Sequence, residues 1–318
     1  MRTAIFAAIG LLIAQSTTAA TLQIVARISL AGGKGRIDHL AFDSEHRRLF
    51  VAERGNDTVA VVDVDQRRFE RRLGGFHEPQ GIAFDAPLQR LFVANGVDGF
   101  VHAFDTRDFK LLKIIPLASD ADNVRIDSAG RVYVGYGNGG LAVLNSSSLE
   151  KVGDIRLKAH PEAFQLAGDR IYVNVPGQEE VAVVDRSSSK QVGSWPATRW
   201  SANYPMAIEE DAGSVLVVFR EPARIARYSI QGGSISADAE VCGDADDVFI
   251  DAKRQRVYVI CGEGVVDVLD RATLKKIDAI PTSPGARTGL YSTEADALFV
   301  AVRAGDGREA AVWVLKPN

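Results

Sequence analysis

The stretch "RRLFVAERGNDTVAVVD" (residues 47–63) decides the fold, because its pattern recurs along the 318-residue chain. Two runs rich in β-branched and aromatic residues flank a polar Gly-Asn-Asp segment, which is typical of a β-hairpin. "QRLFVANGVDGFVHAFD" (residues 89–105) repeats the pattern closely. Seven such hairpins align on one bulky residue of the first run. These seven marker residues are Phe50, Phe92, Tyr133, Tyr172, Leu216, Tyr258 and Phe299.

The markers follow one another at intervals of 42, 41, 39, 44, 42 and 41 residues. Each interval has room for four short strands, and in the first unit we expect them at 37–43, 48–53, 58–64 and 69–75. A period of about 40 residues with four strands per unit indicates a β-propeller. A pair of β-sandwiches would not repeat one motif seven times. The sequence therefore predicts an all-β fold, a seven-bladed β-propeller with four-stranded blades.

The two ends of the sequence indicate how the ring closes. The seventh unit stops after its third strand, at "AAVWVLKPN" (residues 310–318), and so lacks a fourth. The segment "TLQIVARISLAGG" (residues 21–33) precedes the first unit and has the composition of a strand. Such a strand can complete the last blade and leave no open sheet edge. We therefore predict that the N-terminal strand closes the ring.

The repeats resemble those of a known group, the bacterial YVTN-type or YncE-like seven-bladed propellers. The resemblance is carried by "RLFVAERGNDTVAVVD" and "RLFVANGVDGFVHAFD", and it extends over essentially all of residues 21–318. It implies the seven-bladed fold. It implies little about activity, because the relatives include nucleic-acid binders, surface proteins and other exported proteins, and a fold does not set a function.

The first 20 residues have the pattern of a secretory signal peptide. A basic start at Met1-Arg2 is followed by an apolar run at 4–14 and by the small residues "QSTTAA" at 15–20. The apolar run is short for a membrane-spanning helix and no basic flank follows it, so a membrane anchor is the less favoured alternative. We expect a signal peptide at 1–20 and one propeller domain at 21–318. The mature protein should be periplasmic or secreted, monomeric and without a membrane span.

Net charge limits the class of partner. The formal net charge of the chain is −4, and removal of Arg2 with the signal peptide makes it about −5. Nucleic-acid backbones bind to basic surfaces, so a nucleic acid is a disfavoured partner. We expect a small polar ligand or a partner protein instead.

A binding site is expected at one mouth of the central channel. The loops before the first strand and after the second strand of each blade share one face of a propeller. At the start of the first strand, the seven repeats carry different polar side chains. A residue shared by all repeats would indicate packing, whereas differences of this kind are expected at a binding site. A solvated funnel would also need polar groups, so that interpretation stays open. The candidate ligand-binding residues are His39, Gln80, Asn123, His160, Glu162, Tyr204, Asp246, Asp247 and Arg287.

Two functions fit these candidates. The first is a non-catalytic protein that binds a small polar ligand, a metal ion or a partner protein at the channel mouth. The second is a metal-dependent hydrolase, because four candidates align at one level and form an oxygen-rich set that would suit Ca²⁺ or another divalent cation. That set is His39, Asn123, Glu162 and Asp247.

The hydrolase is similar to propeller lactonases, which place Glu, Asn and Asp around one channel metal. The resemblance implies a metal-activated water, with Asp246 or His160 as base and Arg287 stabilising the oxyanion. The four residues do not reproduce the lactonase motif in sequence, which leaves this function as the alternative.

The two cysteines stand on the same predicted face. Cys242 lies in the loop that leads into the sixth unit, and Cys261 ends the second strand of that unit. In an exported protein this placement indicates a disulfide, which would hold the acidic segment "GDADD" (residues 243–247) against the following turn. A metal–thiolate site is the alternative, although neither cysteine has a nearby Cys or His partner in sequence.

Overall fold

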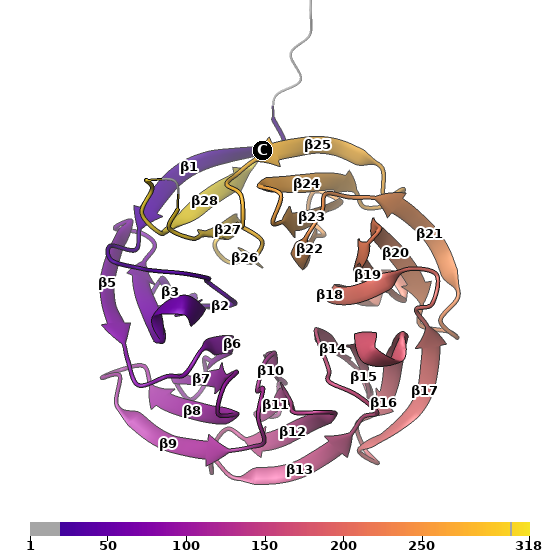
Figure 1. Ribbon diagram of the computed structural model, residues 1–318, viewed down its shortest axis with the longest axis horizontal. Helices are drawn as coiled ribbons and strands as arrows, with labels where there is room; N and C mark the ends of the chain where they lie inside the picture. Colours follow the sequence, from indigo (N-terminus) through magenta and orange to yellow (C-terminus); the bar gives the residue numbers. More distant parts are fainter. Residues whose placement is uncertain (1–19, 306) are drawn as a thin grey trace, which may run out of the picture.

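A computed structural model describes residues 20–305 and 307–318 as a ring of seven four-stranded antiparallel sheets (Figure 1). The inner strands surround the axis and the outer strands form the perimeter. The predicted seven-bladed β-propeller is therefore confirmed. Residues 1–19 lie outside the described residues, and the predicted signal peptide falls almost entirely on them. No helix in the described part of the chain is long and apolar enough to cross a membrane.

Each of the first six blades is a run of four consecutive strands, numbered here in chain order. Blades 1 to 3 are β2 (Leu40–Asp43), β3 (Arg48–Glu53), β4 (Thr58–Asp63) and β5 (Arg68–Leu73); β6 (Pro79–Asp85), β7 (Arg90–Asn95), β8 (Phe100–Asp105) and β9 (Leu111–Pro116); and β10 (Val124–Ile126), β11 (Arg131–Tyr136), β12 (Gly140–Asn145) and β13 (Lys151–Arg156). Blades 4 to 6 are β14 (Phe164–Ala167), β15 (Arg170–Val175), β16 (Glu180–Asp185) and β17 (Lys190–Pro196); β18 (Ser201–Glu209), β19 (Ser214–Glu221), β20 (Ala223–Ser229) and β21 (Ile235–Glu240); and β22 (Ala245–Asp251), β23 (Arg256–Cys261), β24 (Val265–Asp270) and β25 (Lys276–Pro281).

Blade 7 joins the two ends of the described chain. It consists of β26 (Gly289–Ser292), β27 (Ala297–Val302), β28 (Ala311–Pro317) and, as the outer strand, β1 (Leu22–Ser29). The register runs from Leu22 opposite Pro317 to Ser29 opposite Ala311, with one irregularity after Ile24. Closure of the ring by the N-terminal strand is thus as predicted (Figure 1).

The hydrophobic core lies between the blades rather than within one sheet. The second and third strands of a blade are covered on both faces by neighbouring blades, so most of them are largely apolar runs without strict alternation, as in β3 and β7. Phe50 is fully buried and packs with Ile82 of the next blade and with Phe76 of the loop that leads into it. The outer strand β5 is exposed or half-buried up to its last residue, Leu73, because it lies at the perimeter of the ring. The marker residues of the repeat therefore pack in the core between adjacent blades.

Short 3-10 helices replace tight turns at three places in the described chain. They are η1 (Arg54–Asn56), η2 (Pro176–Gln178) and η3 (Glu210–Ala212). Asp57 follows η1 with φ of 55°, in the left-handed region that Asp and Asn tolerate better than most residues. The polar segment between the two runs of the first hairpin therefore reverses the chain, as the sequence indicated, through a short 3-10 helix.

Candidate functional site

Strand register defines three levels along the channel. The third level consists of the inner-strand residues paired with the seven markers. These are Ala41, Ala83, Arg125, Gln165, Ala207, Phe249 and Leu290. The second level lies two residues earlier in each blade. It consists of His39, Gly81, Asn123, Ala163, Pro205, Asp247 and Thr288. The first level lies three residues before the third. It consists of Asp38, Gln80, Asp122, Glu162, Tyr204, Asp246 and Arg287.

This register corrects one alignment made from the sequence. Glu162 belongs to the first level, whereas His39, Asn123 and Asp247 belong to the second. The cause is the turn after the inner strand: β14 ends at Ala167 only three positions before β15 begins, whereas β2 ends five positions before β3. The four residues aligned as a metal set therefore do not share one level. Across residues 20–305 and 307–318, no three His, Cys, Asp or Glu side chains are grouped so that they could hold a metal ion.

Asp246 is the most heavily paired acid of the first level. The Nε atom of Arg287 lies 2.9 Å from its Oδ2, and the Nη2 atom of Arg36 lies 3.4 Å from the same oxygen. Arg220 donates to its other oxygen. Burial raises the pKa of Asp246, and the three guanidinium groups oppose that shift. Two predicted residues, Asp246 and Arg287, are thus in direct contact at the mouth.

His39 lies among three carboxylates. Its Nδ1 atom is 3.8 Å from Asp247, and its Nε2 atom is 3.6 Å from Asp38 and 4.0 Å from Asp122. Burial alone would lower its pKa, but the close carboxylate of Asp247, with the charges of Asp38 and Asp122, raises the pKa to about 10. At neutral pH the side chain is therefore an imidazolium that neutralises part of the acidic cluster.

Asp122 and Glu162 are the acids with the fewest partners. Burial, reinforced by neighbouring carboxylates, raises the pKa of each to about 7. For Asp122 the nearest cation is the imidazolium of His39 at 4.0 Å. For Glu162, no Arg, Lys or His nitrogen of the described residues lies within 4.0 Å of its carboxylate. These two side chains can accept a proton, a hydrogen bond or a cation from a ligand.

Asp247 and Asn123 differ in whether their side-chain oxygens have hydrogen-bond partners. Asp247 accepts a 2.8 Å hydrogen bond from the backbone N–H of Gly289, which ties blade 6 to blade 7. Asn123 is 3 % exposed, and its buried Oδ1 atom has no hydrogen-bond partner among the described residues. Gly81 is required at the second level, because a Cβ there would lie 2.0 Å from the carbonyl oxygen of Asp122.

The remaining predicted residues stand around the cluster. Gln80 donates to Asp120 at 3.4 Å, and His160 makes a 2.7 Å hydrogen bond with the carbonyl oxygen of Gly137. The ring of Tyr204 lies under Arg220, whose guanidinium carbon is 4.3 Å from the ring centroid. Tyr204 thus contacts an arginine of the cluster, whereas Gln80 and His160 bond to Asp120 and Gly137.

A disulfide joins Cys242 and Cys261, as predicted, with Cα atoms 5.8 Å apart. It excludes the metal–thiolate alternative, because both sulfur atoms are used. The segment that it anchors reaches the mouth directly: Asp244, two residues after Cys242, accepts a 2.8 Å hydrogen bond from Arg287. The disulfide therefore fixes the acidic loop of blade 6 at the candidate site.

Below the mouth the channel contains a cavity of about 410 Å³. Its wall combines His39, Asp247, Arg125 and Gln165 with apolar groups such as Phe249 and Leu290. A second cavity of about 230 Å³ shares Arg125, Gln165, Asp247 and Phe249 with the first. Sequence reasoning missed Arg125, although it is the only charged residue at the third level. Comparison of that position across the seven repeats would have found it.

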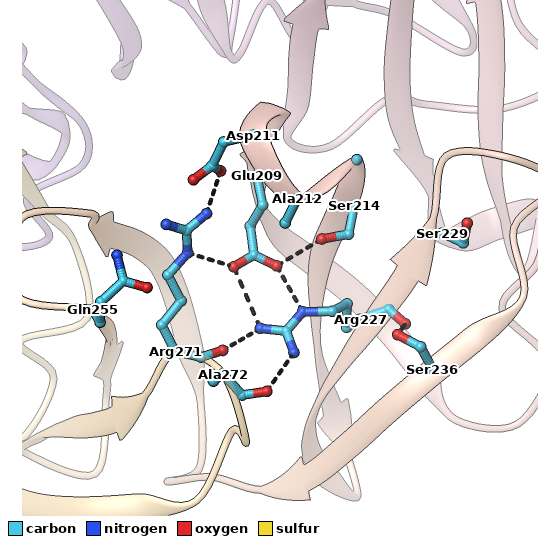
Figure 2. A pocket seen from close by; sticks show the side chains of 11 residues that line it. Glu209, Asp211, Ala212, Ser214, Arg227, Ser229, Ser236, Gln255, Arg271 and Ala272 are labelled. Carbon is cyan, nitrogen blue, oxygen red and sulfur yellow. Dashed lines mark hydrogen bonds and ion pairs between the residues drawn. The ribbon is translucent and has the colours of Figure 1, made fainter.

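A larger cavity, of about 520 Å³, lies at the opposite face between blades 5 and 6 (Figure 2). Figure 2 shows the Glu209 carboxylate enclosed by Arg227, Arg271 and Ser214, which lie 2.7, 2.9 and 2.8 Å from its oxygens. Although burial acts to raise the pKa of Glu209, these donors lower it. The acid has no capacity left for a ligand. Asp127 and Arg186 make the equivalent contact between blades 3 and 4, so this is an interblade clamp.

Comparison with known proteins supports the fold. The chain is similar to a solved structure named Kuenenia stuttgartiensis Hydrazine Synthase, with a TM-score of 0.75 over 90% of this chain and 95% of that chain. The two are 15% identical in sequence, so the likeness shows the fold alone. The sequence matches no family model and no curated protein.

Proposed function

We propose that this protein is an exported, non-catalytic β-propeller that binds a small polar ligand at the mouth of its central channel. The carrying observation is the pair of under-compensated, half-buried acids, Asp122 and Glu162, at the first level of the channel, one level above His39 and Asp247, which line a cavity. Burying a carboxyl group away from a partner costs free energy, and an apolar plug would close the channel at lower cost. A ligand that donates N–H groups or brings a cation would offset this cost.

Export and family relationship belong to the same proposal. The disulfide supports an oxidising compartment such as the periplasm or the extracellular space. The hairpin repeats support a place among the YVTN-type, YncE-like propellers. In such a compartment, a rigid ring with a lined channel suits capture of a small molecule.

Ligand binding can be tested by calorimetry with the purified protein and a panel of small polar amines, amides and zwitterions. We expect at least one saturable ligand whose Kd rises about tenfold or more in Glu162→Gln, because a charge-assisted contact is lost. Glu240→Gln is the matched control, since the Glu240 side chain is 85% exposed on the outer strand β21. Binding that is equal in both variants would place the ligand elsewhere.

The same purified protein can be used to test the alternative function, a metal-dependent hydrolase. Elemental analysis after dialysis measures whether a divalent cation is bound in stoichiometric amount. One Ca²⁺ or other divalent ion per chain, lost in Asp247→Asn, would favour the metal-dependent hydrolase over the binding protein.

A further inference from the structure

We infer that the channel ligand carries a carboxylate, and that Arg125 is the residue that binds it. The inference rests on the proposed function, because it assumes that the channel is the binding site. It adds the chemical class of the ligand and a residue in the third level, below the acidic mouth.

Arg125 lies where a ligand in the channel would meet it. It belongs to the short inner strand β10 and lines both channel cavities. Much of the surrounding wall is apolar, with Phe249 and Leu290 at the same level. A guanidinium in such a wall is a strong and directional attraction for an oxyanion.

Most of the donors of Arg125 have no partner. Its Nη1 atom donates to the carbonyl oxygen of Val124 at 2.9 Å, and its guanidinium carbon lies 5.8 Å from the ring centroid of Phe164. Among the described residues, no carboxylate oxygen lies within 4.0 Å of its nitrogens. An arginine has five N–H donors, so most of them are left for a ligand.

Three arginines at the channel mouth are each paired with an acid. Arg36 lies 2.9 Å from Asp38, Arg287 lies 2.8 Å from Asp244, and Arg220 contacts Asp246. Arg125, one level below His39 and Asp247, has no such pair. Burial lowers its pKa, and only the more distant charges of Asp247 and Asp122 oppose this. A bound carboxylate would supply the missing counter-charge.

The repeat itself shows that packing does not require a cation at this position. The equivalent residues of the other blades are Ala41, Ala83, Gln165, Ala207, Phe249 and Leu290. The other six blades thus pack around the same channel with neutral side chains. The charge of Arg125 in blade 3, at the wall of a cavity, is explained by binding of a ligand.

Cavity and mouth together define the ligand. An apolar body fits the wall formed by Phe249 and Leu290, the carboxylate meets Arg125, and a donor group at the other end meets Asp122 or Glu162. The ligand class is therefore a small organic carboxylate with an apolar body, small enough for about 410 Å³.

Calorimetry with phenylacetate, hexanoate and 6-aminohexanoate, each beside its neutral amide, tests this assignment. We expect at least one carboxylate to bind and its amide to bind about tenfold or more weakly. Arg125→Leu should abolish that preference, and Arg125→Lys should keep part of it. A carboxylate that binds equally to the Leu variant, or no better than its amide, would overturn the inference.

Thermal unfolding without ligand provides a second readout. Arg125→Leu, which copies Leu290, should keep or raise the Tm, whereas Arg220→Leu, which breaks a paired contact, should lower it. A clear fall in Tm for Arg125→Leu would make Arg125 a structural residue and overturn the inference. If amines and amides bind through Glu162 while no carboxylate binds, the inference fails and the proposed function stands. If nothing in either panel binds, both fail.

Discussion

His39 and Asp122 show how the surroundings of single residues set their charge at the channel mouth. Burial disfavours the charged form of both side chains. It lowers the pKa of His39, but three surrounding carboxylates reverse the shift and raise the pKa to about 10. Asp122 has one imidazolium at 4.0 Å and further acids nearby, and burial raises its pKa to about 7. The number of opposite partners therefore decides which group stays charged at neutral pH.

Asp122→Asn should remove part of the pH dependence of stability. The folded protein keeps a proton on Asp122 up to about pH 7, whereas the unfolded chain releases it near the ordinary value of 3.8. The folded state binds more protons within that window, so this group makes the free energy of unfolding fall as the pH rises through it. The variant should gain stability relative to the wild type between about pH 4 and pH 7.

Urea unfolding at several pH values across this window measures the effect. Glu240→Gln, with its exposed side chain, should follow the wild type throughout. A constant difference between Asp122→Asn and the wild type at every pH would contradict the raised pKa of Asp122.

At the scale of elements, the hairpins could be predicted because the same sequence pattern occurs in all seven repeats. Most second and third strands are largely apolar, and each marker such as Phe50 or Tyr258 is buried between blades. A missing fourth strand at one end and a strand-like segment at the other predicted the pairing of β1 with β28. These features depend on local composition and on order along the chain, both of which the sequence contains.

The levels of the channel were less predictable. Alignment of the repeats by sequence puts Glu162 one position off, because the turn between β14 and β15 is shorter than the turn between β2 and β3. A shift of one residue in a strand moves a side chain to the opposite face, so a small error in turn length changes the composition of a site. The cause is physical: inner strands are short, and their apolar pattern fixes register only weakly.

The clamp between blades 5 and 6 allows a prediction about stability. Arg271 and Glu209 are both almost fully buried, and Arg227 holds the same carboxylate (Figure 2). Removing one partner of a buried ion pair costs about 3–5 kcal/mol when the other charge is left alone. Because Arg227 remains, Arg271→Ala should lower the free energy of unfolding by about 2 kcal/mol.

Arg107→Ala is the matched control, since Arg107 is 70% exposed where it pairs with Asp105. Water screens an exposed pair, so the effect of this substitution should be small. Urea unfolding with the m-value held common to all proteins measures both changes. If Arg271→Ala is as harmless as the control, the clamp does not hold the blades together.

At the scale of the whole molecule, the ring creates contacts that no local pattern encodes. Arg36 of the segment before blade 1 reaches Asp246 of blade 6, 210 positions along the chain. His39 meets Asp122 of blade 3 and Asp247 of blade 6 in the same way. Sequence alone could nominate polar residues at the mouth. It could not say which acids are neutralised, because that depends on which blades face each other across the axis.

Closure of the ring by β1 should control the stability of the entire propeller. Loss of residues 20–31, which include β1, exposes the edge of β28 and removes the buried side chains of Leu22, Ile28 and Leu30. Burial of one such side chain stabilises by about 1.5–3 kcal/mol, so the three together approach the net stability of an ordinary domain. A chain that begins at Gly32 should therefore lose most of its cooperative unfolding transition relative to a chain that begins at Ala20. In hydrogen exchange, β28 should lose protection first and β12 of blade 3 last, because a ring opened at blade 7 frays from its free edge. A truncated chain that keeps both its unfolding midpoint and the protection of β28 would show that the other six blades hold the ring without the N-terminal strand.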